Sequence, residues 1–275
     1  MWMRRTIVVA SAAVMTLLAL PALAADAPKA APAKPAAAAA SAAPAAPAAM
    51  PGKLADFWIF WPKAGHEAEF EAAVKAHVGW RKQMREGFFW EAYQPVVGSD
   101  LARYVFRSGQ HHWADFDAQQ VWELANKADE MFNRDVAPLL ARYEHYIEEE
   151  DYASSHWVEG VDYRYFMVAE HKLKPGMSGA IAEATAKIHK GLQAGGWTQS
   201  YALSRSIGGP GGLTLVFPYA SYAAMEEPKP GFMEVLTKGM DSPAAAQAAI
   251  QQFDDSVAES DTTIYMVRPD LSTPK

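Results

Sequence analysis

Two histidines and a glutamate in one short stretch are the most conspicuous candidates for chemistry in this chain. Residues 65–81 read G-H-E-A-E-F-E-A-A-V-K-A-H-V-G-W-R. A zinc-protease helix needs a second histidine four residues after the first, so that both rings lie on one helical face. Phe70 stands at that position, and His77 lies three turns from His66, about 16 Å along a helix axis. One metal ion cannot bridge that distance, so we predict no metal site.

Sequence motifs for nucleophilic or nucleotide chemistry are missing from the chain. It has no cysteine, which excludes thiolate metal sites, disulfides and a cysteine nucleophile. The glycine-rich stretch 208–212 resembles a phosphate loop in composition, but no Lys-Ser or Lys-Thr pair follows it. It lies between two expected strands and is predicted to be a hairpin turn.

The chain repeats itself, and the repeat provides an internal comparison for the first helix. K-A-G-H-E-A-E-F-E-A-A-V-K-A-H at 63–77 matches K-P-G-M-S-G-A-I-A-E-A-T-A-K-I at 174–188. Further matched positions follow at offsets of 107 to 111 residues: Trp90 with Trp197, Gly98 with Gly209, and Phe106 with Phe217. An offset that stays between 107 and 111 residues over several motifs indicates two related halves.

One face of the expected helix 66–86 carries polar residues where the repeat keeps apolar ones. His77 and Arg81 correspond to Ile188 and Leu192, which are typical of a core stripe. Burying an imidazole and a guanidinium without partners costs several kcal/mol, roughly 2–7 for each polar group. The two side chains therefore either find partners in the fold or line a cavity between helix and sheet. The sequence leaves both alternatives open.

The neighbouring strands supply further polar and aromatic side chains for such a cavity. The candidate ligand-binding residues are Trp58, His77, Arg81, Tyr93 and Arg103. A histidine and an arginine together suit a planar, anionic organic ligand. The alternative is a polar barrel core with internal ion pairs, such as Glu91 with Arg103.

A secondary candidate site lies on the first strand of the second half. Period-two alternation places Tyr163, Tyr165 and His171 on one face, and Arg205 is expected on a neighbouring strand. The acidic run 148–151 lies at the junction between the halves and is predicted to be a solvated linker.

Hydrophobic periodicity predicts the same element order in both halves. The first half is predicted as strand 54–61, helix 66–86, strands 88–97 and 101–107, a helical region 113–142 that breaks near Pro138, and strand 143–149. The second half is predicted as strand 161–171, helix 177–194, strands 197–207 and 213–218, an interrupted helical region 220–259, and strand 262–268.

The strands are apolar on both faces, so both faces of the sheets must be buried. We predict an α+β fold of two tandem ferredoxin-like units (βαββαβ twice) that form one pseudo-dimeric α/β barrel with the helices outside.

The strand followed by x-x-G-x-E-x-E-F-E-A-A at a helix start resembles the dimeric α/β-barrel superfamily, which includes antibiotic-biosynthesis-monooxygenase-like and stress-responsive barrel proteins. The resemblance covers residues 53–268 and implies two fused copies. That superfamily contains monooxygenases, isomerases, haem enzymes and proteins without known activity, so the resemblance implies a fold and no single function. The resemblance to haem-binding members makes His189 a minor candidate for a haem ligand. Apart from that alternative, we predict no cofactor.

The first residues predict export. Residues 1–24 combine a basic start, an apolar run too short to cross a bilayer, and small residues at 22–24 that suit signal peptidase. Residues 25–52 are mostly Ala and Pro and are predicted to be a disordered linker. Two ferredoxin-like units, 53–155 and 156–275, should follow. We expect a periplasmic or secreted protein without stable membrane insertion after cleavage.

The charge balance narrows the class of partner. Cleavage removes two arginines, so the net charge of −7 becomes −9, with 23 basic against 32 acidic residues. We therefore expect no binding to nucleic acid. The leading hypothesis is a binding protein whose partner is a small planar or anionic organic molecule. The alternatives are a cofactor-free monooxygenase or haem-dependent oxidase that uses His77, and a structural or stress-related protein without a pocket. Catalysis and oligomeric state remain open at this point.

Overall fold

The computed structural model describes residues 51–208 and 212–274. These residues belong to one compact unit, Ala49–Lys275. The predicted signal peptide and nearly all of the predicted linker lie outside the described residues, as does the centre of the glycine-rich turn.

Strands and helices follow one another in the order that the periodicity predicts. The first half contains β1 (Leu54–Pro62), α1 (Glu67–Gln83), β2 (Glu91–Val97), β3 (Tyr104–His111), α2 (Trp113–Asn126), α3 (Ala128–Asp135) and β4 (Leu140–Glu150). The second half contains β5 (Tyr165–Leu173), α4 (Ser178–Gly195), β6 (Ala202–Ser206), β7 (Leu213–Tyr219), α5 (Phe232–Gly239), α6 (Pro243–Ser256) and β8 (Val257–Val267).

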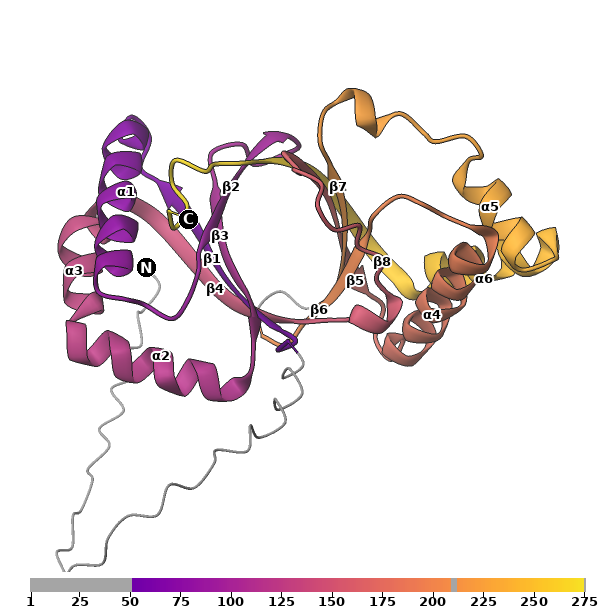
Figure 1. Ribbon diagram of the computed structural model, residues 1–275, viewed down its shortest axis with the longest axis horizontal. Helices are drawn as coiled ribbons and strands as arrows, with labels where there is room; N and C mark the ends of the chain where they lie inside the picture. The colour runs from indigo at the N-terminus through magenta and orange to yellow at the C-terminus, as the bar shows by residue number, and fades with distance from the viewer. Residues whose placement is uncertain (1–50, 209–211, 275) are drawn as a thin grey trace, which may run out of the picture. The chain divides into compact units, whose positions relative to one another are not determined.

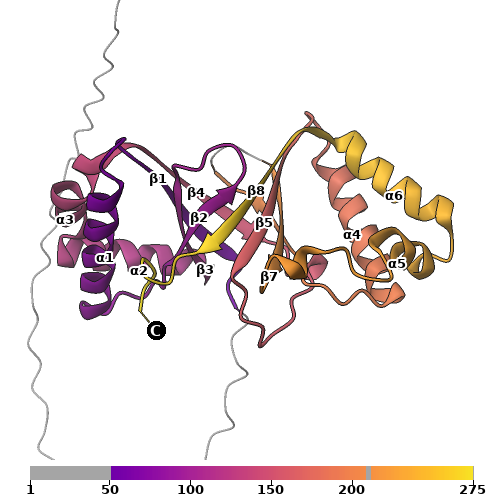
Figure 2. The ribbon, with the colours of Figure 1, turned by 90° about the horizontal axis from the view of Figure 1, so that it is seen from above.

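The eight strands form one antiparallel sheet that closes on itself. The order around the barrel is β1-β3-β2-β8-β5-β7-β6-β4, and β4 pairs back with β1. Two ladders join the halves, β2 with β8 and β4 with β6. Helices α1, α2 and α3 lie on one side of the strands, and α4, α5 and α6 lie on the other (Figures 1 and 2). The predicted α+β class with an antiparallel sheet is thus confirmed.

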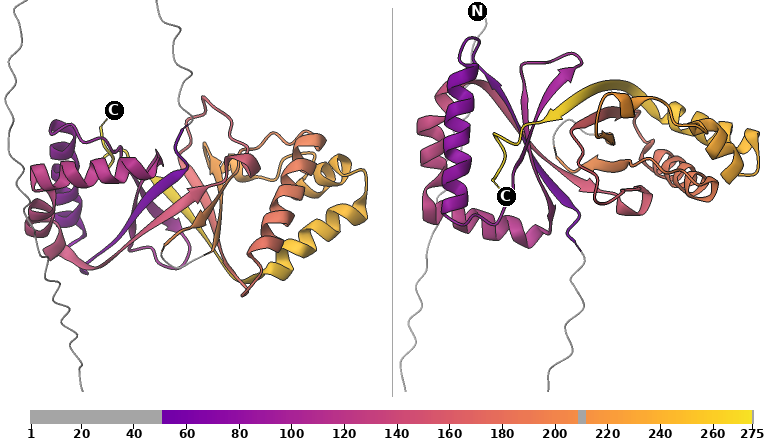
Figure 3. Two further views of the ribbon diagram at one scale, coloured as in Figure 1. Left: turned by 90° about the horizontal axis from the view of Figure 1, so that it is seen from below. Right: turned by 45° about the horizontal axis from the view of Figure 1, so that its top comes forward.

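Alternation along the strands divides the side chains between two environments. Outward residues of β1, β2 and β3 pack with α1 in a first core: Phe60, Phe70, Val74, Ala92, Tyr104 and Phe106. A second core joins β6 and β7 to α4 and α5: Ile181, Leu192, Leu203, Leu213, Val235 and Leu236. Ile59 and Val105, one position along their strands, point inward and form a third cluster with Tyr146 and Tyr265. The two outer cores join strands to helices, and Figure 3 shows the two groups of helices on either side of the strands.

The region 113–142 differs in detail from the prediction. Its first break falls at Lys127, whose left-handed backbone (φ 55°) separates α2 from α3. Pro138 lies within a short 3-10 turn between α3 and β4, where its missing N–H breaks no helical hydrogen bond. Strand β3 begins at Tyr104 because residues 101 and 102 continue the turn after β2. In the part of the chain that the structure describes, no helix is long and apolar enough to cross a membrane.

Candidate functional site

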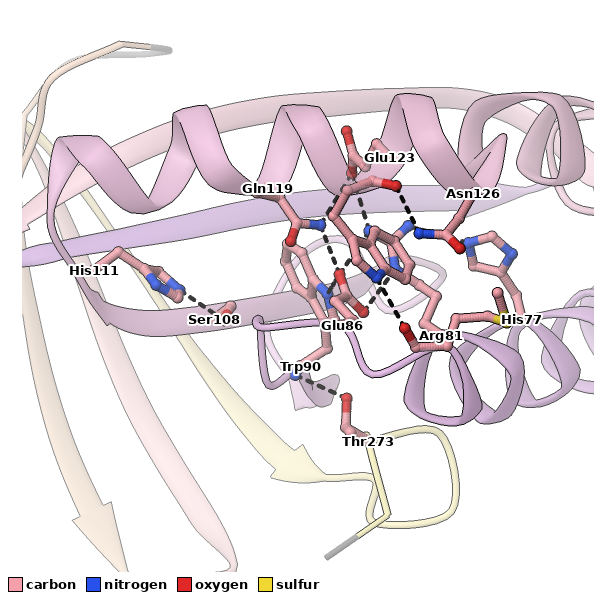
Figure 4. A network of polar contacts seen from close by, with 12 residues as sticks. His77, Arg81, Glu86, Trp90, Ser108, His111, Gln119, Glu123, Asn126 and Thr273 are labelled. Atoms are coloured by element: carbon pink, nitrogen blue, oxygen red, sulfur yellow. Dashed lines mark hydrogen bonds and ion pairs between the residues drawn. The ribbon is translucent and has the colours of Figure 1, made fainter. Parts of the chain in front are cut away.

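The polar residues of α1 find partners within the first helix layer, which consists of α1, α2 and α3 (Figure 4). Arg81 donates two hydrogen bonds to the Glu86 carboxylate, from Nε at 2.8 Å and from Nη2 at 2.6 Å. Arg81 Nη2 also lies 3.0 Å from Glu123 Oε1 of α2. Gln119 and the Trp90 indole donate to Glu86 at 2.8 and 3.0 Å. The Glu86 side chain is 2% exposed, so four donor groups serve one buried carboxylate.

The charges of this network compensate one another. Burial disfavours the Arg81 guanidinium, but Glu86 and Glu123 outweigh that effect and raise the pKa of Arg81 above its usual value. The guanidinium also lies 5.2 Å from the centroid of the Trp122 ring, within cation–π range. Of the two alternatives that the sequence left open for Arg81, the observed one is partnering within the fold.

His77 lies on the same helix face, beside Asn126 (Figure 4). Its Nε2 is 3.3 Å from Arg81 Nη1. Because arginine can only donate, Nε2 must accept, and the ring proton then lies on Nδ1. Nδ1 is buried and finds no hydrogen-bond partner among the described residues. Burial, and then the Arg81 charge, lower the pKa of His77 to about 4, so the ring is neutral at pH 7.

Two of the other first-half candidates lie away from this network, on opposite faces of the sheet. Trp58 stacks on His145 of β4, with ring centroids 4.2 Å apart, and packs against the first core. Tyr93 packs in the inner cluster and donates a hydrogen bond to Glu91 at 2.9 Å. Burial is the main cause that raises the pKa of Tyr93 above its usual value.

Arg103, the fifth candidate, faces the barrel interior. Its guanidinium lies 3.9 Å from Glu170 of β5 and 5.4 Å from the centroid of the Tyr265 ring. The ion pairs thus differ from the Glu91–Arg103 pair named as an alternative, since Glu91 lies 3.8 Å from Arg107. The structure therefore brings His77 and Arg81 together and does not gather all five first-half candidates around one cavity.

The secondary candidates also separate. Tyr163 precedes β5 and bonds to Ser200 at 2.7 Å, and the Tyr165 ring lies 4.4 Å from that of Tyr222. Arg205 approaches Asp151 at 3.9 Å.

His171 lies near the far end of β5. Its Nδ1 is 2.7 Å from the Ser260 hydroxyl, and its ring packs edge-on against Phe253 of α6.

A pocket of about 290 Å³ opens at the barrel end where β5 finishes and β7 and β8 begin. Its lining comes from β4, β5, β6, β7, β8 and one residue beside them: Tyr146, Glu148, Glu170, His171, Lys172, Ser206, Gly212, Leu213, Thr214, Glu259, Ser260 and Asp261. The pocket edge needs a glycine at position 212, because a Cβ there would lie 2.4 Å from the His171 carbonyl oxygen and its φ is +141°.

Glu148 is the most deeply buried acid of the pocket, at 5% exposure. It accepts hydrogen bonds from the Thr214 hydroxyl at 3.0 Å and from the Ser204 hydroxyl. Burial is the largest influence and raises the pKa of Glu148. Burial also raises the pKa of Glu170, which the neighbouring Arg103 opposes. The pocket therefore holds two carboxyl groups that protonate more readily than usual.

The sequence analysis missed Glu148 for an identifiable reason. It assigned 148–151 to a solvated linker, whereas Glu148, Glu149 and Glu150 complete β4. The usable signal is the period-two alternation of Tyr146, Glu148 and Glu150, which places all three on the inner face. The acidic run is therefore the end of a strand that has one face toward the barrel interior and one face outward.

The comparisons with known proteins identify the fold. The "putative monooxygenase" of Fusobacterium nucleatum superposes with a TM-score of 0.51 at 14% identity, covering 78% of this chain and 91% of that one. A mutant chlorite dismutase from Candidatus Nitrospira defluvii gives a TM-score of 0.49 at 11% identity, covering 80% of this chain and 94% of that one. No protein-family model and no curated protein matches the chain. The first likeness places the chain in the dimeric α/β-barrel fold.

The donor atoms of the pocket limit what it can hold. Among residues 51–208 and 212–274, no group of three or more His, Asp or Glu side chains is placed to hold a metal ion. Haem also fits poorly, because its propionates are anionic and the lining carries four acids against one lysine. His189 does not line the pocket; its Nδ1 bonds to the Tyr201 hydroxyl at 3.0 Å.

Proposed function

We propose that the chain is a binding protein for a small organic molecule, which it holds in the barrel-end pocket. The observation that carries the proposal is a buried carboxylate, Glu148, that faces an open volume of about 290 Å³. Pockets for small ligands usually combine such a volume, near the lower end of the usual range, with a few inward polar groups.

The position of the pocket also supports binding. Five strands contribute to its wall, so the lining side chains are fixed by backbone ladders rather than by loops alone. A rigid wall lowers the entropy that a ligand must overcome on binding. In this proposal His77 and Arg81 stabilise the packing of α1 and bind no ligand. The ligand binds in the barrel-end pocket instead.

Filling the pocket tests the proposal. Ser206, at the end of β6, lines the pocket, and Ser206→Trp should occupy it. We expect a library of small compounds, screened by ligand-observed NMR, to give hits for the wild-type chain that disappear in Ser206→Trp. The matched control is Ser178→Trp, at an exposed position at the start of α4, which should keep every hit. No hits for the wild type, or hits unaffected by Ser206→Trp, would refute the proposal.

A catalytic role is a second proposal for the same pocket, with less support. A monooxygenase or oxidase activity of the barrel type draws on the names of proteins with the same fold, and fold alone does not carry function. The pocket contains two carboxyl groups with raised pKa values, and shifted pKa values of this kind are common among acids and bases of active sites. A structural or stress-related role without a ligand is the outcome if the pocket binds nothing.

We further propose that the barrel consists of two fused ferredoxin-like copies, 53–155 and 156–275. The repeated element order and the matched sequence motifs support this origin. Coexpressing the two segments as separate chains tests it, since related halves should assemble into the barrel through the β2–β8 and β4–β6 ladders.

We also propose that the protein is exported from the cytoplasm. The basic start, apolar run and small residues of 1–24 support a cleaved signal, followed by the linker 25–52. Fractionation of the host cell and N-terminal sequencing should find a chain that begins at Ala25 outside the cytoplasm. A full-length cytoplasmic chain would rule this out.

A further inference from the structure

We propose that the barrel-end pocket selects organic cations, with the Glu148 carboxylate as their counter-ion. This inference rests on the proposed binding function and adds the class of ligand. It reverses the charge of the ligand that the sequence suggested for His77 and Arg81.

The first step is the state of Glu148. The Ser204 and Thr214 hydroxyls donate to its two oxygens, one to each. A carboxylate can accept about four hydrogen bonds, so each oxygen keeps capacity on the pocket side. Both donors are neutral, in contrast to Glu86, where Arg81 supplies a bidentate cation. A ligand ammonium group would supply the positive charge that Glu148 lacks.

The second step is the charge of the remaining lining. Lys172 lies 3.5 Å from Glu259 at the exposed rim, so that pair compensates itself. Glu170 lies 3.9 Å from Arg103. Arg107, which pairs with Glu150 and Glu91, lies outside the lining, but its charge lowers the pKa of Glu148 against the larger effect of burial. The lining itself still carries four acids against one lysine, and its two remaining acids are Glu148 and Asp261. The field at the pocket floor therefore favours a cation and disfavours a carboxylate or phosphate.

The third step is the aromatic surface. Tyr146 lines the pocket and packs in the inner cluster with Tyr265. One face of the Tyr146 ring stacks on Phe57, with centroids 5.1 Å apart. Tyr265 already holds one cation, because the Arg103 guanidinium lies 5.4 Å from its ring centroid. Tyrosine faces near a carboxylate suit ammonium groups. With no metal-binding group among the described side chains, the expected cation is organic.

Three probes of matched shape and different charge test this inference: benzylammonium, benzyl alcohol and benzoate. Each would be titrated into the full chain by calorimetry at pH 7 and low ionic strength. We expect benzylammonium to bind about tenfold or more tighter than benzyl alcohol, since a hydrogen bond between two charged groups is stronger than one between neutral groups. Benzoate should bind weakest.

Two variants localise the effect. Glu148→Gln keeps the shape of the side chain and should abolish the preference for benzylammonium. Glu149→Gln removes the same charge from the next residue of β4, which is exposed and points to the other face, and should keep the preference. Preference that survives in Glu148→Gln overturns the inference. Thermal unfolding checks that both variants fold.

The failures of the two proposals are distinguishable. Equal or tighter binding of benzoate by the wild-type chain overturns the cation inference and leaves the binding function intact. No binding of any compound in the pocket, in this titration and in the wider screen, overturns both. The wild-type comparison needs no variant, so the inference stays decidable even if Glu148→Gln does not fold.

Discussion

The helix layer around Glu86 and the barrel-end pocket around Glu148 both bury a glutamate, but they give it different partners. Glu86 receives a bidentate guanidinium, an amide and an indole N–H. Glu148 receives two hydroxyls beside an open volume. A buried charge with a complete set of partners contributes to a fixed structure. A buried charge with neutral partners and free space is available to a ligand.

The two regions should also respond to pH in opposite directions. His77 in the helix layer has a lowered pKa, whereas Glu148 in the pocket has a raised one. Acidification should therefore weaken the first region and favour the second. Four substitutions or titrations examine this contrast, from the largest expected effect to the smallest, and a fifth, at Glu86, repeats the last change in the other region.

Removing the cation of the helix layer should have the largest effect. Arg81→Met leaves the Glu86 carboxylate buried without its charge partner, and we expect a loss of about 3–5 kcal/mol of unfolding free energy. Urea denaturation measures this loss. Arg134→Met is the control, because the Arg134–Asp135 pair is exposed and should leave the unfolding midpoint unchanged. A small loss in Arg81→Met would contradict a structural role for the network.

Acid titration of His77 comes next. The unfolded chain binds a proton at this ring below about pH 6.5, whereas the folded chain binds it only near pH 4. Unfolding therefore takes up a proton between these values, and stability should fall by up to about 3 kcal/mol as the pH drops through that window. His77→Gln cannot titrate. The difference in unfolding free energy between wild type and His77→Gln, measured from pH 7 to pH 4, should change by that amount. A pH-independent difference would show that His77 titrates normally.

The sequence could predict much of the fold and of the first region. The strand and helix periodicity gave the order of the elements, because burial on known faces imposes periods of 2 and 3.6 residues. The replacement of Ile188 and Leu192 by His77 and Arg81 identified a buried polar pair. Their partners could not be deduced, because Glu86 lies in the loop after α1 and Glu123 on another helix. The Arg81–Glu86 pair depends on the path of the loop five residues on, and the Arg81–Glu123 pair depends on how two helices pack; periodicity encodes neither.

The sequence did not predict the pocket, and the physical reason is a different one. Glu148 belongs to an acidic run, and such runs are usually solvated. Its burial depends on the register of β4 against β6, where Glu148 pairs with Ser206. The β6–β7 and β5–β7 ladders then bring Thr214 and Glu170 to the same end of the barrel.

Weakening the hydroxyl partners of Glu148 should have a moderate effect. Thr214→Val removes a donor 3.0 Å from Glu148 Oε1 and keeps the side-chain shape, so we expect a loss of about 1–2 kcal/mol at pH 7. The loss should shrink as the pH falls, because a protonated Glu148 needs the donor less. Urea denaturation at pH 7 and pH 5 measures both values. Thr262→Val, at an exposed site on β8, should show neither the loss nor its pH dependence.

Neutralising Glu148 itself should have the smallest effect on stability. Burial raises the pKa of Glu148 because it disfavours the ionised carboxylate, and Glu148→Gln removes that cost. We expect the unfolding free energy to stay level or rise by up to about 1 kcal/mol, as removal of strained polar groups from functional sites commonly does. The wild type gains stability as the pH falls from neutral toward the ordinary carboxyl range, because the folded chain then binds a proton that the unfolded chain does not. The variant lacks this gain, so the difference in unfolding free energy should shift in favour of the wild type on acidification.

The same change at Glu86 provides the opposite case. Glu86→Gln removes the anion that Arg81 needs and should destabilise the chain by several kcal/mol, about 3–5. If Glu148→Gln were as damaging as Glu86→Gln, both glutamates would be structural and the pocket would lose its main argument. If Glu148→Gln is neutral or stabilising while it also removes ammonium selectivity, the chain retains a carboxylate that its stability does not need. Binding is then the physical reason for a buried acid at the end of this barrel.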